Sequence, residues 1–445
     1  MKKITDFINS IYFIILVNLI AVVFWYLKLP LVTYIIYLVF VIIIILTNAN
    51  RSAIGSLLLS GIIAYQIDEG DYLEFHALYA KIFIPLGIIV IILFTVDLIK
   101  RRKTFKLTPI FYGLLFLLIA NILSFINVRG KEITFIATLG VLQLLGYLII
   151  YAYLVNSNDI EGKKYISNVA LVTATAVTVQ FLIHYLTLGN VDSKHDNNLS
   201  WAISNTIAMF YFVLIPISLY NYFRNQKKFY IALISGINFF MMLFMLSRGN
   251  YLSTAVIAIP LVIMFIYLAK DKKRLFVDFL TIFCIGIVLT ITLGAELGLI
   301  DLLKGYFDDI DFLDGSGRWN LFKKGWELFL EYPIFGAGSY TGAFYLVDHH
   351  VGTYHSYLIQ TIATTGIVGL VSLVYFIYVV IKTSLIKDNY NLLFLISFIY
   401  ILIHGLVDNT IYNPVIMVFI AVTMPYLDKQ YENLEKLQVS NQMQV

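Results

Sequence analysis

Cysteine and charge are both scarce in this chain. Its single cysteine, Cys284, lies inside an apolar run, so we exclude disulfides and cysteine-ligated metals and expect a small buried hydrophobe here. Only 13% of the 445 residues are charged, about half the share found in soluble domains. Hydrophobic residues make up 60%, and the mean hydropathy is +0.85. No water-soluble core could bury so much apolar sequence, so the composition indicates a polytopic membrane protein.

The sequence also lacks a glycine-rich phosphate-binding loop in the links between its apolar runs. Its net charge of +4 does not form a basic face, because the Lys and Arg residues sit in those short links. Such a distribution is a topology signal, and it argues against a nucleic-acid partner.

Apolar runs long enough to cross a membrane recur along the chain. We count about 14, with 12 as the lower bound because the third run and the last two are short. The predicted fold class is an all-α polytopic membrane protein in which residues 1–445 form a single integral membrane domain. The first run follows Lys2 and Lys3 without a small-residue cleavage site, so we predict an uncleaved first span.

The basic residues predict the orientation of these spans. About 21 of the 31 fall in one set of alternate links, which the positive-inside rule assigns to the cytoplasm. Both ends of the chain belong to this set, so we expect a cytoplasmic N-terminus and a cytoplasmic polar tail at 428–445. The longest polar segment, 294–354, belongs to the other set and is predicted to be a large extracytoplasmic loop. Nucleotide-driven chemistry would need the cytoplasmic side, so any activated donor must be carried by a lipid.

The extracytoplasmic loop contains an amphipathic pattern near 318–331, which Pro333 ends. The apolar residues of one face are Trp319, Phe322, Trp326, Phe329 and Leu330. A helix of this kind is typical of the membrane interface, and the alternative is that it only caps the helix bundle. We assign Trp319 and Trp326 to substrate binding. Arg318 lies in its first turn, where a guanidinium can face a lipid-linked phosphate and bind it through two oxygens.

The next candidates follow this helix. Gly336 and Gly338 allow the backbone to approach a ligand closely or to take a positive φ, although ordinary turns look the same. His355 opens an apolar run and so lies at the outer membrane surface, either as a general base for a sugar hydroxyl or as a structural hydrogen-bonding residue. We assign its neighbours Ser356 and Tyr357, with the two glycines, to substrate binding.

A metal site is the alternative reading of the same loop. The triad His349, His350 and His355, or the pair Asp309 and Asp311, could hold a divalent cation. An Asp-x-Asp pair arises easily by chance in an acidic loop, so we favour a solvated loop and expect neither a metal nor another cofactor.

A second polar cluster lies outside the loop. Arg248, in Ser247-Arg248-Gly249, stands at the outer end of an apolar run, where an arginine is costly and usually has a partner. His404 and Asp408, with Asn409, lie near the outer end of the penultimate run and could contribute polar contacts to this site, so we assign His404 and Asp408 to substrate binding. The alternative is that they only form a polar helix end.

Three motifs, in this order, resemble the bacterial O-antigen ligase and polysaccharide polymerase family. They are Ser247-Arg248-Gly249, the stretch from Arg318-Trp319 through Trp326 to Pro333-Ile334-Phe335-Gly336-Ala337-Gly338, and His355-Ser356-Tyr357-Leu358 with Thr365-Gly366-Ile367-Val368-Gly369-Leu370. The resemblance covers mainly residues 247–414, and Ser356 stands where many relatives have asparagine.

The resemblance implies a type C glycosyltransferase-like helical fold in the bacterial cytoplasmic membrane. It also implies a metal-independent enzyme that transfers glycan from undecaprenyl diphosphate with inversion. The family's catalytic positions correspond to Arg248, Arg318 and His355. The expected partners are a polyprenyl-diphosphate-linked oligosaccharide and membrane lipid, with a chain-length regulator and a flippase as further candidates.

Three functions stay open at this point. We favour a polymerase that moves a growing chain onto the next lipid-linked repeat unit of a capsule, exopolysaccharide or O-antigen. A ligase would instead move finished polymer to lipid A core or another acceptor. A lipid-oligosaccharide flippase is less favoured, because charged residues within the spans are few.

Overall fold

The computed structural model describes residues 1–66, 72–100, 105–157, 159, 161–188, 197–296, 318–346, 352–386 and 388–427. Regular structure in these ranges is helical, apart from one isolated bridge between Leu199 and Ala202, so the all-α prediction is confirmed. The elements are α1 (Lys2–Ile8), α2 (Ile11–Tyr26), α3 (Pro30–Thr47), α4 (Ser52–Ile63), α5 (Tyr72–Lys100), α6 (Pro109–Leu123), η1 (Ser124–Asn127), α7 (Lys131–Val155), α8 (Gly162–Leu188), α9 (Ser204–Ser218), α10 (Tyr220–Arg224), α11 (Phe229–Leu243), α12 (Arg248–Leu268), α13 (Lys272–Glu296), α15 (Arg318–Glu331), α16 (Gly342–Tyr345), α17 (Tyr357–Ser384), α18 (Asn389–His404), α19 (Pro414–Thr423) and η4 (Met424–Leu427).

Many of these helices can cross a membrane. Among the described residues, eight are long and apolar enough, and the pair α1 and α2, bent by 66°, makes a ninth candidate. Four shorter apolar segments are α4, α11, α18 and α19 with η4. Most of α4 is buried by its neighbours, and a helix inside a bundle needs less than full membrane length. A polytopic membrane protein is therefore confirmed, whereas 14 crossings remain a prediction.

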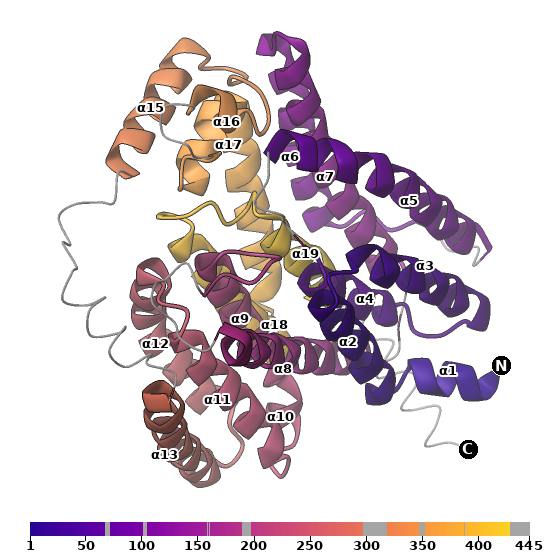
Figure 1. Cartoon of the computed structure of the whole chain (residues 1–445), viewed down its shortest axis with the longest axis vertical. Coiled ribbons are helices and arrows are strands. Elements are labelled where there is room, and N and C mark those ends of the chain that lie inside the picture. Colours follow the sequence, from indigo (N-terminus) through magenta and orange to yellow (C-terminus); the bar gives the residue numbers. More distant parts are fainter. Residues whose placement is uncertain are drawn as a thin grey trace.

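The C-terminal helices lie in the middle of the molecule (Figure 1). In this view α17, α18 and α19 separate the N-terminal helices α1–α7 from α11–α13. α17 packs on α6, α18 packs on α9 and α12, and α19 packs on α7. Every residue of α9 except Asn205 is buried, so α9 belongs to the centre of the bundle.

Polar side chains join the helix ends into two groups. In one group, Lys163 pairs with Asp388 at 2.9 Å; in the other, Gln66 donates to the carbonyl of Trp25 at 2.8 Å. Further contacts of the first group join Thr5 to Thr47, Gln226 to Asp271 and Tyr222 to Asp278, and those of the second join Asn197 to Phe244 and Asn127 to Gly336. Each contact joins links that the sequence assigns to the same side of the membrane, and this assignment of sides remains a prediction.

Arg51 departs from the simple topology pattern, because it is fully buried. Its Nε and Nη2 donate to Asp97 at 2.9 and 2.6 Å, and its Nη1 donates to the carbonyls of Ile44 and Ala49 at 2.8 and 2.6 Å. The Tyr153 hydroxyl donates to the same carboxylate at 2.7 Å. A buried guanidinium needs this full set of acceptors, because an unpartnered buried charge costs several kcal/mol. Arg51 therefore clamps α5 and α7 to the start of α4.

Cys284 is exposed on α13, so the expectation of a buried cysteine is wrong. α13 packs on α11 through Ile282 and Gly286, and this contact turns the adjacent Phe283 and Cys284 outward. The predicted tail at 428–445 lies outside the described residues.

α17 is broken at Gly366, which has φ +64° inside the helix. Residues 333–338 lie against the break, and the two segments exchange backbone hydrogen bonds. The bonds run from Ala337 N to Ala363 O (3.0 Å), from Gly338 N to Thr364 O (3.0 Å), from Ile367 N to Pro333 O (2.9 Å) and from Val368 N to Ile334 O (3.3 Å). In an unbroken helix the same four groups of α17 would bond to each other. The 333–338 segment thus replaces the hydrogen bonds that the break removes, which a buried backbone requires.

Two glycines make this backbone contact possible. A Cβ on Gly336 would lie 2.2 Å from the carbonyl carbon of Thr364, and a Cβ on Gly366 would lie 2.4 Å from the oxygen of Ile334. Both residues also have positive φ, +69° and +64°, which side chains disfavour. The break and the turn therefore need glycine on each side.

The same segment is tied to the N-terminal half. The Ser339 hydroxyl donates to Asn121 Oδ1 at 2.6 Å, and the Ser339 amide donates to the Ser124 hydroxyl at 3.0 Å. Asn127 donates to the carbonyl of Gly336 at 2.7 Å. Much of the predicted outer loop is therefore part of the packed structure.

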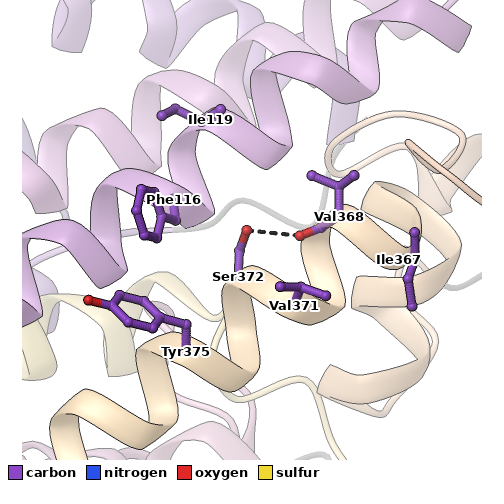
Figure 2. A pocket seen from close by; sticks show the side chains of 7 residues that line it. All are labelled: Phe116, Ile119, Ile367, Val368, Val371, Ser372 and Tyr375. Carbon is purple, nitrogen blue, oxygen red and sulfur yellow. Dashed lines mark hydrogen bonds between the residues drawn. The ribbon is translucent and has the colours of Figure 1, made fainter.

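Beyond the break, an apolar groove of about 480 Å³ lies between α6 and α17. Figure 2 shows Phe116 and Ile119 of α6 facing five residues of α17. The hydroxyl of Ser372 donates a hydrogen bond to the carbonyl of Val368 at 2.8 Å, so it does not face the groove as a free donor. The five residues of α17 are Ile367, Val368, Val371, Ser372 and Tyr375. The groove thus presents an almost wholly apolar surface.

Candidate active site

His355 lies just before α17 in a left-handed conformation, with φ +47°. Its side chain is 26% exposed, so a ligand at the protein surface can contact it, whereas Ser356 and Tyr357 are buried. The amide of Tyr357 donates to the carbonyl of Gly405 at 2.9 Å, which ties the start of α17 to the end of α18. This contact brings His355 to the segment that follows His404.

Asp408 joins two histidines in that segment. Its Oδ1 lies 3.4 Å from His355 Nδ1, and its Oδ2 lies 3.7 Å from His404 Nε2. The Asn409 amide donates to Oδ1 at 2.7 Å, and the Asn205 side chain donates to Oδ2 at 3.5 Å. Burial opposes ionisation of this carboxyl, but hydrogen bonds from both histidines outweigh burial and hold the pKa of Asp408 well below its usual range. Asp408 is therefore a carboxylate at neutral pH.

The start of α12 approaches this group from another side. Gly249 lies so close to His404 that a Cβ there would be 3.2 Å from the ring carbon Cε1. Ser253 Oγ is 3.3 Å from His404 Nδ1. Arg248 is exposed at the first position of α12, where the Ser247 hydroxyl caps the helix by accepting from Asn250 N at 3.3 Å. Gly249 and Ser253 of α12 thus lie against His404, whereas the assignment of Arg248, His404 and Asp408 to the site remains a prediction.

α15 packs on α17 through one narrow face. Leu321, Gly325 and Leu328 are buried there, and Gly325 allows close approach because a Cβ would lie 2.3 Å from Ile359 and 2.9 Å from Tyr354. The tryptophans face away: Trp319 is 71% exposed and Trp326 is 50% exposed. α15 therefore has a second apolar surface that the described chain leaves uncovered.

Arg318 is half-buried at the start of α15. The hydrogen bonds and ion pairs described for this chain do not join it to His355, Asp408 or Arg248. Its assignment to the site therefore remains a prediction, as do those of Trp319 and Trp326.

Gly336 and Gly338 have the predicted positive φ, with values of +69° and +117°. The backbone that Gly336 approaches is that of α17, so this glycine has a structural reason to be there. The roles of Gly336, Gly338, Ser356 and Tyr357 in substrate binding remain predictions.

The candidate metal ligands Asp309, Asp311, His349 and His350 lie outside the described residues. In the ranges that are described, no group of three or more His, Cys, Asp or Glu side chains is arranged to hold a metal ion. Two residues of the site escaped sequence reasoning, Asn205 and Ser253. Each is a common polar residue in an apolar helix, and only the tertiary contacts with Asp408 and His404 distinguish them.

Fold and site together describe a polytopic helical membrane protein whose histidine–carboxylate group lies where the ends of α12, α17 and α18 meet. Residues 230–374, about a third of the chain, match the model of the O-antigen ligase family. The match confirms the resemblance for this part of the chain and supports an O-antigen ligase or polymerase type of membrane enzyme. It contains Arg248, Arg318 and His355 and ends before His404 and Asp408. No curated protein matches the chain at a significant level.

Proposed function

We propose that the protein is a glycan polymerase of the bacterial cytoplasmic membrane. It moves a growing chain from a polyprenyl diphosphate carrier onto the next lipid-linked repeat unit, with inversion at the anomeric carbon. In this proposal the chain crosses the membrane 14 times with both ends in the cytoplasm, and the site faces outward. The observation that supports it most is the pairing of the accessible His355 ring with the partly buried carboxylate of Asp408, whose pKa is lowered.

His355 acts as the base in the proposed reaction. With Nδ1 directed at Asp408, its Nε2 is the ring nitrogen free to take the proton from the acceptor hydroxyl. The acceptor oxygen then forms a bond to the anomeric carbon, and the bond from that carbon to the diphosphate oxygen breaks. Arg248 and Arg318 stabilise the negative charge that develops on the departing polyprenyl diphosphate.

The groove between α6 and α17 supports a lipid-borne donor. Its lining is apolar, and it begins at the break in α17, about three helical turns beyond His355. An isoprenoid chain many tens of ångströms long can reach from a diphosphate at the helix ends into this groove. We propose that the groove receives part of the carrier's tail.

A ligase is the second candidate, and the name of the matching family favours it. Both reactions use the same donor and the same base, so the acceptor separates them. A deletion strain that accumulates single lipid-linked units indicates a polymerase, whereas long lipid-linked chains indicate a ligase.

The test replaces His355 by asparagine, which tolerates positive φ and keeps the local backbone while it removes the base. We expect purified His355→Asn protein to lose about 10²–10⁴-fold of its polymerising rate on lipid-linked repeat units. His184→Asn, which makes the same change on α8, is the matched control and should retain the wild-type rate. Full polymer synthesis by the His355→Asn variant would refute the proposal, and wild-type protein that only moves lipid-linked sugars across vesicles would favour a flippase.

A further inference from the structure

We propose that His404 is a positioning residue that carries a proton and pairs with Asp408, so that His355 stays unprotonated and able to act as the base. The inference rests on the proposed function, because it assigns that role to His355. It concerns a residue beyond the segment that matches the family.

The hydrogen-bond pattern defines the proton on one side of the His404 ring. Ser253 has a single hydroxyl proton, and it donates this proton to the carbonyl of Gly249 at 2.7 Å. With the hydroxyl proton on this shorter bond, the Ser253 oxygen accepts from His404 Nδ1, 3.3 Å away, and we assign a proton to Nδ1 on this basis. A neutral His404 would then present a bare Nε2 lone pair to Asp408.

The other side of the ring faces a carboxylate. Nε2 lies 3.7 Å from Asp408 Oδ2, within ion-pair distance, and this buried atom has no hydrogen-bond partner among the described residues. A lone pair and a carboxylate oxygen repel each other, whereas an N–H at the same place is attracted to the carboxylate. The arrangement is therefore stable when His404 is an imidazolium with both nitrogens protonated.

His404 cannot contact a substrate itself. It is 1% exposed, with Gly249 against its ring edge and the Tyr400 ring stacked on it at 5.6 Å. Its effect on the reaction must therefore pass through Asp408. The titratable and charged groups around it are Asp408 with His355 behind it, Tyr400 on its own helix, Arg248 at the start of α12 and Tyr357 beside Gly405.

The consequence for His355 is electrostatic. Asp408 alone would favour the protonated form of His355, and an imidazolium cannot accept a proton from a hydroxyl. A second imidazolium on the other carboxylate oxygen balances the charge of Asp408. His355 then keeps its hydrogen bond to Asp408, which orients the ring, without holding the extra proton.

The test compares His404→Leu and His404→Gln in the polymerisation assay across pH 5.5–9. Both variants remove the cation, and only glutamine can still donate a hydrogen bond to Asp408. We expect the acid limb of kcat/KM to move up by about one pH unit in both, with the rate within a few-fold of wild type at pH 8.5–9. A wild-type acid limb in the glutamine variant, or an equal loss at every pH in both, would show a merely structural role and overturn the inference.

A second measurement does not depend on activity. In ¹⁵N-histidine-labelled protein, the signals that disappear in the His404→Gln variant should report two protonated ring nitrogens between pH 6 and 8. Signals of a neutral ring in that range would overturn the inference even if polymerisation occurs. Imidazolium signals in a protein without polymerase activity would instead leave the charge pair established and refute the proposed function.

Discussion

His355 occupies a backbone conformation that few residues with side chains adopt. Its φ of +47° stores of the order of 1 kcal/mol of strain, which the surrounding structure must hold in place. Three contacts do so: Tyr354 N to Gln360 Oε1 at 3.1 Å, Tyr357 N to Gly405 O, and the imidazole to Asp408. In this conformation the ring lies against the carboxylate of Asp408.

The carboxylate of Asp408 leads to a prediction about stability and pH. We expect Asp408→Asn to lower the free energy of unfolding by roughly 1.5–3 kcal/mol, the value of hydrogen bonds to a charged group. Because the folded protein depresses the pKa of Asp408, its contribution is complete above the unfolded value of about 4 and is lost as pH falls below it.

Thermal unfolding in detergent from pH 8 to pH 3 checks this prediction. The difference between wild type and Asp408→Asn should not shrink between pH 8 and about pH 5, and it should fall below about pH 4. A difference that disappears near pH 6 would contradict an ionised, depressed Asp408.

At the residue scale, the sequence alone pointed to Arg248, His355, His404 and Asp408, because polar side chains at the ends of apolar runs are costly. It could not show that Asp408 lies between the two histidines, because that depends on how the segment after α18 turns back on α17. The hydroxyl of Ser253 gave no signal, since serine is common in membrane helices.

Among the helices, α17 shows most clearly what sequence patterns miss. Its hydrophobic run predicts a single span from near His355, and the run continues across Gly366 without a gap. The break depends on hydrogen bonds from residues 333–338, and backbone pairing leaves no periodic side-chain pattern. α15, by contrast, covers Arg318–Glu331, the range in which the stripe of aromatic residues predicts a helix.

The glycine at the break gives a second prediction. Gly366→Ala would place a Cβ 2.4 Å from the Ile334 oxygen at positive φ, so we expect a loss of roughly 3 kcal/mol or more of stability and a matching loss of activity. Gly146→Ala in α7 is the control, because no atom lies within 4 Å of its Cβ position and alanine is the better helix former. Equal thermal stability of the two variants would argue against the exchange of hydrogen bonds.

The groove gives a third prediction. Val371→Trp fills the groove between α6 and α17, whereas Val374→Trp places the same bulk on the same helix outside it. We expect Val371→Trp to raise KM severalfold for a donor with a full-length isoprenoid tail and to leave a short-tailed donor unaffected. The Val374 variant should behave as wild type with both donors, and identical behaviour of the two variants would remove the groove from the donor site.

At the scale of the whole molecule, composition and charge distribution were sufficient to predict a helical membrane protein. They were not sufficient for the burial of Arg51, because a lysine or arginine in a short link looks the same whether it meets water or a buried carboxylate. The partner, Asp97, lies near the end of α5, 46 residues further along the chain.

The orientation in the membrane gives a fourth prediction. In a Cys284→Ser background, Arg129→Cys before α7 and Lys227→Cys before α11 are separated by α7, α8 and the α9–α10 segment. Three crossings put the two thiols on opposite sides. We expect a membrane-impermeant maleimide to label position 129 in intact cells and position 227 only after permeabilisation. Labelling of both in intact cells would refute the proposed topology.

The contact of Ser339 with α6 has a consequence for the order in which the protein is assembled. Asn121 and Ser124 meet Ser339 across 218 and 215 positions of sequence, so α6 enters the membrane long before its partner is synthesised. In the proposed topology, residues 333–339 are translocated and must then pack against helices that are already inserted. A fragment limited to residues 230–374 contains both 333–338 and the break in α17 but lacks α6, so we expect it to lose the contacts that Ser339 makes with Asn121 and Ser124. The segment that matches the family can therefore be recognised from the sequence alone, but it reaches its final packing only after the N-terminal helices have been inserted.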